Sequence, residues 1–111
     1  MQLTTIKKTV GTSAANTAVT VSLPGGKRKI VHNVFVSYSG APTQAGVTVK
    51  YKSGTGAAYD TVVLTGSANA QNTILPLDSR IVLDEKDGIE VTAPAGGGAL
   101  TASVTIISQE L

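Results

Sequence analysis

The sequence predicts an all-β fold, a β-sandwich of the jelly-roll type with about eight short strands and no significant helix. Thr, Val, Ala and Gly dominate the composition, and β-branched residues suit the pleated surface of a sheet. Several segments alternate apolar and polar residues, and turns rich in Gly and Pro separate them at regular spacing. The 111 residues fit one domain, 1–111, that is long enough to bury its own core.

The clearest strands are those whose apolar residues recur at every second position, as in 19–23 and 47–52. The first ends at Pro24-Gly25-Gly26, because proline cannot donate to a strand ladder and glycine opens a turn. We expect a polar loop at 66–72 and a mobile loop at 94–98. The expected strands are 3–10, 19–23, 28–38, 47–52, 59–65, 74–77, 80–83, 89–93 and 100–106.

The segment 28–38 is the longest apolar-rich stretch, and we expect it to be the central strand. Strict alternation assigns Ile30, His32, Val34, Val36 and Tyr38 to one face and Val31, Asn33, Phe35 and Ser37 to the other. We expect the first face to point into the core, because its apolar run is more continuous. Val31 and Phe35 would then be covered by a loop or by another subunit.

Composition and charge exclude several classes of protein. Charged residues make up only 14% of the chain, against a typical value of about 25%. The net charge of +2 is too small to predict nucleic-acid binding, and no apolar run approaches the roughly 20 residues of a membrane helix. The N-terminal residues lack the apolar region of a signal peptide, and the absence of Cys excludes disulfides and thiolate metal sites.

Candidate catalytic and metal-binding residues are few. His32 is the only histidine, and no motif provides the nucleophile or carboxylate partner that catalysis would need, so we expect a packed or interface side chain. The acidic stretch Asp84, Glu85, Asp87 and Glu90 could suggest calcium but lacks the EF-hand spacing. Asp87-Gly88 is better explained as a hairpin turn. We therefore predict no enzymatic activity, no cofactor and no metal.

Lys27-Arg28-Lys29 forms the one compact basic cluster, directly after Gly25-Gly26. It does not match a P-loop, so it is either a solvated strand start or a docking site for an acidic partner surface. Tyr38, Tyr51 and Tyr59 could alternatively form a platform for sugar stacking. The candidate partner-binding residues are Lys27, Arg28, Lys29, Val31, Phe35, Lys50 and Lys52.

Three stretches, KRKIVHNVFVSYSG, VTVKYKSG and IVLDEKDGIEVTAP, carry a family resemblance. In these stretches, in length and in its Thr-, Ala-, Gly- and Val-rich composition, the chain resembles the decoration proteins of tailed-phage capsids, also called cement or stapling proteins. It is most similar to the stapling proteins of epsilon-fifteen-type phages.

The resemblance implies a jelly-roll subunit, made in the host cytoplasm, that sits on the outer surface of the virion. Such a subunit would bind neighbouring copies of the major capsid protein, as a dimer or trimer, and would clamp them against the pressure of packaged DNA. The alternative that the residues leave open is a carbohydrate- or receptor-binding module of a phage or bacterial surface structure.

Overall fold

The computed structural model describes residues 6–42, 45–68, 72–75 and 81–110. In this part of the chain there are nine strands and one 3₁₀ turn, η1, and no helix is long and apolar enough to cross a membrane. The elements are β1 (Ile6–Thr12), β2 (Val19–Leu23), β3 (Lys29–Tyr38), β4 (Ala45–Lys52), η1 (Ala57–Tyr59), β5 (Thr61–Ala68), β6 (Asn72–Leu75), β7 (Ile81–Leu83), β8 (Gly88–Ala93) and β9 (Ala102–Glu110).

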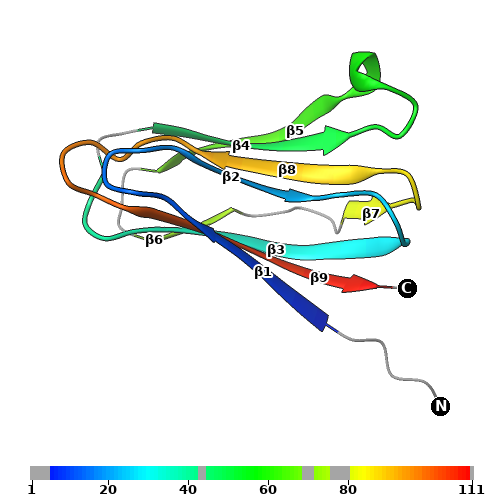
Figure 1. The fold of residues 1–111 in the computed structure, drawn as a ribbon, viewed down its shortest axis with the longest axis horizontal. Helices are drawn as coiled ribbons and strands as arrows, with labels where there is room; N and C mark the ends of the chain where they lie inside the picture. Colours follow the sequence, from blue (N-terminus) through cyan, green and yellow to red (C-terminus); the bar gives the residue numbers. More distant parts are fainter. Residues whose placement is uncertain (1–5, 43–44, 69–71, 76–80, 111) are drawn as a thin grey trace.

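The strands form two antiparallel sheets that pack face to face (Figure 1). One sheet has the order β1-β9-β3-β6, with β7 also paired to β3, and the other has the order β2-β8-β4-β5. Each sheet thus alternates strands from the two halves of the chain, which is the wiring of a jelly roll. β6 and β7 share one strand position, since both pair with β3. The predicted fold class is confirmed.

The core lies between the sheets and consists mostly of valine. The alternation seen in the sequence holds in β2, β4 and β8, where every second residue is buried and its neighbours face outward. β-Branched side chains fit this position because they lose little rotamer freedom on a pleated surface. The buried side chains that are both large and fully enclosed are Tyr38, Leu83, Ile89, Ile106, Val31, Val34, Val36, Val47, Val49, Val91 and Val104.

The predicted faces of the central strand are wrong in its first half. β3 shifts register against β9 between Val31 and Asn33, so one extra residue, His32, is inserted on β3. This bulge reverses the alternation: Val31 joins Val34 in the core with 0% of its surface exposed, whereas Ile30 lies half-exposed on the outer face. Val31 is therefore part of the core, so it cannot contact a binding partner while the domain is folded. Phe35 faces outward, as predicted.

Several strand ends differ from those expected. The segment 59–65 begins with the η1 turn, and the predicted loop 66–72 is partly strand, because β5 continues to Ala68 and β6 begins at Asn72. Cross-strand pairing with β4 extends β5 through Gly66 despite the low β-propensity of glycine. Residues 3–5, 69–71 and 76–80, which the predictions also included, lie outside the described residues.

The loop 94–98, expected to be mobile, is anchored to the core. The hydroxyl of Tyr38 donates a hydrogen bond of 2.7 Å to the carbonyl oxygen of Pro94. Gly96 is buried against the Tyr38 ring, and a Cβ at this position would lie 2.8 Å from a ring carbon. Glycine is thus required here by close approach to an aromatic side chain, not by a need for flexibility.

Candidate functional site

The structure divides the seven predicted partner-binding residues among three places. Val31 is in the core, as described above. The basic cluster and Phe35 belong to β3 and the loop before it, in the five-stranded sheet. Lys50 and Lys52 lie on β4, on the outer face of the four-stranded sheet. The candidates therefore do not form one surface, and a single flat partner cannot contact them all.

Each member of the basic cluster has a partner within the chain. The ammonium group of Lys29 donates a hydrogen bond of 2.9 Å to the carbonyl oxygen of Pro24. Arg28 Nε lies 3.6 Å from Asp84 Oδ1, and Lys27 Nζ lies 3.8 Å from Glu110 Oε2. The two ion pairs are largely exposed, so they contribute little to stability and leave these cations accessible to a partner.

Glu110 ties three segments together at this end of the molecule. Its carboxylate accepts a hydrogen bond from the ammonium group of Lys7 and also faces Lys27. The Lys7 hydrogen bond is the main reason that the pKa of the Glu110 carboxyl is lowered, with smaller contributions from the charges of Lys7, Lys27 and Lys29. β1, β9 and the loop between β2 and β3 are thereby linked through one carboxylate.

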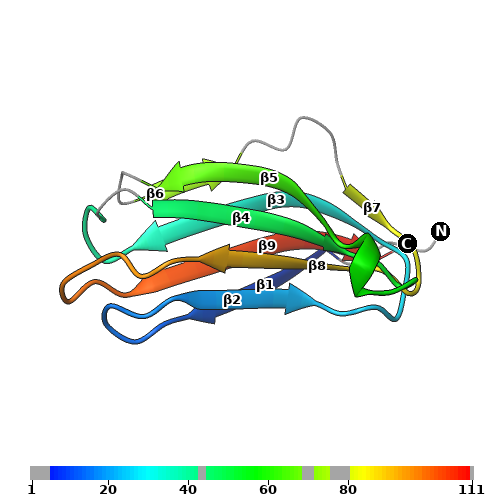
Figure 2. The same ribbon diagram turned by 90° about the horizontal axis from the view of Figure 1, so that it is seen from above.

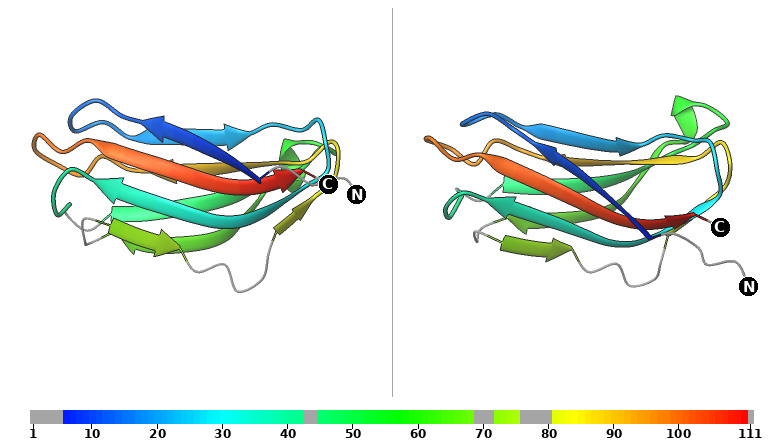
Figure 3. Two further views of the ribbon diagram at one scale, coloured as in Figure 1. Left: turned by 90° about the horizontal axis from the view of Figure 1, so that it is seen from below. Right: turned by 60° about the horizontal axis from the view of Figure 1, so that its bottom comes forward.

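The outer face of the five-stranded sheet, which Figure 3 shows from below, carries several exposed apolar residues among its polar ones. Val10 on β1 is 49% exposed and Val82 on β7 is 55% exposed. Val10 lies opposite Thr105, which in turn lies opposite Phe35, so apolar and polar side chains alternate along this row across the sheet. The apolar residues of this face are Ile6, Val10, Ile30, Phe35, Val82 and Ile107.

The outer face of the four-stranded sheet, which Figure 2 shows from above, carries mostly polar side chains, with the exposed Val62 on its edge strand as an exception. Thr20, Thr92, Thr48 and Thr65 are paired in succession across all four strands and form one row of threonines. The hydroxyl groups of Thr20 and Thr92 lie 3.2 Å apart, within hydrogen-bond distance. A solvated outer face of this kind is the usual arrangement in an antiparallel sandwich. The two outer faces of the molecule are therefore chemically different.

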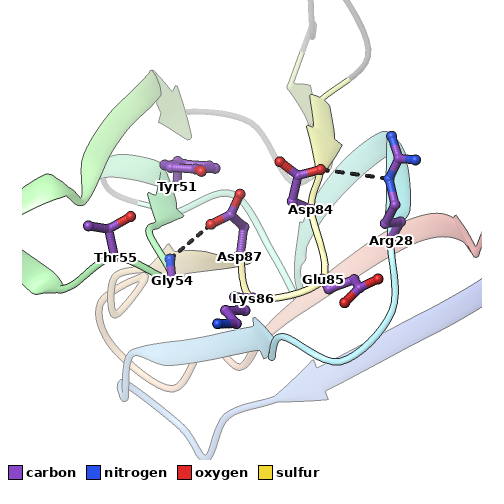
Figure 4. A pocket seen from close by; sticks show the side chains of 8 residues that line it. All are labelled: Arg28, Tyr51, Gly54, Thr55, Asp84, Glu85, Lys86 and Asp87. Carbon is purple, nitrogen blue, oxygen red and sulfur yellow. Dashed lines mark hydrogen bonds and ion pairs between the residues drawn. The ribbon is translucent and has the colours of Figure 1, made fainter.

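A polar hollow of about 870 Å³ lies at the end of the sandwich where the loop between β4 and η1 meets the turn between β7 and β8 (Figure 4). Asp87 is its central group, because its carboxylate accepts a hydrogen bond of 2.8 Å from the backbone N–H of Gly54 and lies beside Tyr51 (Figure 4). The Tyr51 hydroxyl and the Gly54 N–H lower the pKa of Asp87, and the Asp87 carboxylate raises the pKa of Tyr51. The lining residues are Arg28, Tyr51, Gly54, Thr55, Asp84, Glu85, Lys86 and Asp87.

The hollow explains the acidic stretch as a structural turn. The N–H of Asp87 donates to the carbonyl of Asp84 at 3.1 Å, which closes a turn between β7 and β8. The predicted hairpin at Asp87-Gly88 is wrong, because β7 and β8 belong to different sheets and Gly88 is the first residue of β8. Gly54 is required beside this turn, since a Cβ there would lie 2.6 Å from the backbone oxygen of Lys86. In the described part of the chain, no group of three or more acidic or histidine side chains is placed to hold a metal ion.

The remaining singled-out side chains do not gather in one site. His32 is half-buried at the bulge, and its Nε2 lies 2.9 Å from Gln109 Oε1. Among the three tyrosines only Tyr51 lines the hollow, while Tyr38 is enclosed in the core and burial raises the pKa of its hydroxyl. The predicted three-tyrosine platform is therefore wrong, because Tyr38 is inaccessible.

The sequence reasoning missed the apolar outer residues of β1 and β7. Ile6, Val10 and Val82 were not singled out, because each occupies a short alternating segment that reads equally well with either face inward. Gly11 was the available signal. A Cβ at Gly11 would lie 2.4 Å from a side-chain carbon of Val21, so Gly11 faces the other sheet and its neighbour Val10 faces outward.

No protein-family model and no curated protein matches the sequence. Similar chains occur among solved structures, and two of them are as follows. One is a chain in the acidic stable capsid structure of the Helicobacter pylori bacteriophage KHP30, with 15% identity, a TM-score of 0.49, and 95% of this chain and 93% of that chain covered. The other is a chain from the disulfide-linked pili of Bacillus endospore appendages, with 14% identity, a TM-score of 0.43, and 99% and 92% covered. Because the sequence identities and TM-scores are low, the functional proposal rests on the surface of this chain.

Proposed function

We propose that the chain is a structural protein that decorates the outside of a phage capsid and clamps neighbouring copies of the major capsid protein. Its working location would be the outer surface of the virion, and it would act as a homo-oligomer without enzymatic activity. The sequence resemblance described above suggests this function, and the apolar outer face of the five-stranded sheet is the observation that carries it.

A clamp needs buried contact area instead of a reaction. Burial of apolar surface contributes about 25 cal/mol per Å², and the outer face of the five-stranded sheet offers Val10, Phe35 and Val82 for this purpose. Lys8 is the only charged residue among the described outward positions of this sheet between its two ends, so little charge must be desolvated on contact. The polar face of the four-stranded sheet would then point to solvent.

Repetition on a shell strengthens contacts that are individually weak. Many identical capsid sites hold neighbouring copies close together, and each bound subunit raises the effective concentration of the next. The exposed cations Lys27 and Arg28 lie at one end of the docking sheet, where they would steer it toward an acidic capsid surface.

The hollow around Tyr51 provides less support for the alternative of a carbohydrate-binding module. Tyr51 is the only aromatic residue among those that line the hollow, and Asp87 beside it raises the pKa of its hydroxyl. Sugar-binding sites typically present an aromatic face together with free polar groups. The sheet face therefore remains the better-supported contact surface.

The proposal is tested by sedimentation of the purified protein with expanded heads of the phage that makes it. We expect the wild-type chain to pellet with the heads and Val10→Glu to reduce the bound fraction by roughly tenfold or more, because a carboxylate would be buried in the contact. Thr20→Glu is the matched control, since Thr20 is also exposed on an edge strand but belongs to the opposite sheet. Failure of the wild-type chain to bind heads would contradict the proposed function.

A further inference from the structure

β5 is the one edge strand in the described part of the chain that lacks the usual protection against pairing with another strand. It pairs with β4 on one side and lies at the end of its sheet. The other edges are protected, since β1 carries Lys7 and Lys8, β2 is short and followed by Pro24, and β6 and β7 have only four and three residues. β5 has eight residues without any charge or proline.

Exposed apolar side chains concentrate at this same edge. Tyr59 is 64% exposed, Val62 48% and Val63 45%, and all three lie within five consecutive residues. The two valines are both exposed because the register between β4 and β5 shifts opposite Val49 and Lys50. From Leu64 to Ala68 the pairing with β4 is regular, so the free side of β5 there presents backbone donors and acceptors in ordinary strand spacing.

We propose that β5 pairs antiparallel with β5 of a second copy of this chain, about a two-fold axis near Thr65, and joins the two four-stranded sheets into one. The unpaired backbone groups of an edge strand can form hydrogen bonds with another extended strand. A second copy of Thr61–Ala68 is a suitable partner because the two ends of this strand complement each other. Its first half holds the bulky Val62, Val63 and Leu64, and its second half holds the small residues 66–68. Two-fold antiparallel pairing places the bulky half of each copy opposite the small half of the other.

Charge does not oppose this contact. Residues 61–77 include no charged side chain, so two copies can approach along β5 without like-charge repulsion. The outer face of the five-stranded sheet, proposed above to contact the capsid, belongs to the other layer of the sandwich and stays free in such a dimer (Figure 1). Self-association is part of the proposed function, and the β5 interface would explain how it occurs. The inference rests on the proposed self-association and not on capsid binding.

Light scattering and oxidative cross-linking test the interface in solution. We expect the wild-type chain to have the mass of a dimer and Val63→Glu to raise the dimer dissociation constant by at least about tenfold, because each copy would then bring a carboxylate into an uncharged pairing edge, opposite residue 67 of the other copy. Val10→Glu, on the edge of the other sheet, should leave the dimer intact. Circular dichroism checks that both variants remain folded.

A cysteine at the two-fold axis provides a second test that does not depend on a disruptive substitution. The chain has no cysteine, and the axis brings the two copies of residue 65 opposite each other, at Cα distances of about 4.5–5.5 Å that a disulfide can span. Thr65→Cys should therefore form a covalent dimer on mild oxidation, whereas Thr20→Cys, on the edge strand β2, should not. A monomeric wild-type chain would overturn the self-association.

A wild-type dimer that survives Val63→Glu and fails to cross-link through Thr65→Cys would overturn the β5 interface and leave self-association standing. Sedimentation of Val63→Glu with phage heads reports separately on the proposed function. Loss of the dimer with retained head binding would support both assignments, because the two contacts use different sheets.

Discussion

Asp60 shows how single carboxylates hold the loops at the charged end of the sandwich. It follows η1, and its Oδ1 accepts the N–H of Ser53 at 2.8 Å while its Oδ2 lies 2.8 Å from Lys52 Nζ. The Lys52 hydrogen bond is the main cause that lowers the pKa of Asp60, followed by the Ser53 N–H. The same hydrogen bond raises the pKa of Lys52. One side chain thus connects the end of β4 to the start of β5.

This arrangement predicts a stability that depends on pH in the acid range. The folded-state pKa of Asp60 is lower than its ordinary value of 3.8, so its contribution is present above that value and is lost as the pH falls through the folded-state pKa. Chemical denaturation from about pH 5 downward should show a smaller loss of the free energy of unfolding for Asp60→Asn than for the wild-type chain.

Two lysine variants distinguish the cause of this pH dependence. Lys52→Gln should reduce the pH dependence nearly as much as Asp60→Asn, because it removes the main partner. Lys50→Gln should leave most of it, since Lys50 contributes only the weakest of the effects on Asp60. Equal slopes for the wild-type chain and Asp60→Asn would show that this carboxylate is not the group responsible.

At the scale of the element, the bulge in β3 is the feature that decides which residues form the core. The apolar positions on both faces of 28–38 are visible in the sequence, but the register shift between Val31 and Asn33 arises from pairing with β9. β9 is distant in sequence, so local alternation cannot reveal where one extra residue enters the strand. His32, the inserted residue, is held on the outer face by Gln109.

The bulge predicts which of two neighbouring residues, Val31 or Ile30, contributes more to stability. The answer is the opposite of the one that strict alternation predicts. Val31→Ala should lower the free energy of unfolding by about 2 kcal/mol, because it leaves a cavity among fully buried neighbours. Ile30→Ala, although it removes more carbon atoms, should cost less, since Ile30 lies on the outer face and is only half-buried. Urea denaturation of the two variants measures this difference. A larger loss for Ile30→Ala would show that the strand keeps strict alternation.

The elements predicted best are those with local signals. The segments 19–23, 47–52 and 89–93 each alternate cleanly and end at Gly- or Pro-containing turns, and the structure has strands at all three. β5 shows the opposite case, because Gly66 and Ser67 form strand only through pairing with Val47 and Gly46 on β4. The candidate contact surface was harder to predict. Its residues come from strands in both halves of the chain, and local sequence does not show which strands are neighbours in the sheet.

At the scale of the whole molecule, the jelly-roll wiring gathers the charges toward one end. The sequence has long stretches without charge at 9–26, 61–77 and 91–109. The loops 13–18, 39–42 and 94–101, which carry no charged residue, lie together at the end away from both termini (Figure 1). Backbone hydrogen bonds join them, such as Asn16 N–H to the Leu100 carbonyl at 2.8 Å. The opposite end carries the basic cluster, the hollow and η1.

This distribution predicts that capsid binding depends on the charged end and on salt. Reversal of both charges in Lys27→Glu/Arg28→Glu should slow association with expanded heads by about tenfold at low ionic strength, because exposed cations act mainly by steering. The difference should shrink near 1 M salt, where the screening length falls to about 3 Å. Stopped-flow light scattering at several salt concentrations measures both effects.

Stability separates a steering role from a structural one. Lys27 and Arg28 form only exposed ion pairs, each contributing roughly 0–1 kcal/mol, so the melting temperature of the double variant should stay close to that of the wild-type chain. Lys29 is left unchanged because its bond to the Pro24 carbonyl holds the loop before β3. Lys50→Glu is the control on the opposite sheet and should not alter association. Unchanged association of the double variant at low salt would remove the basic cluster from the contact with the capsid.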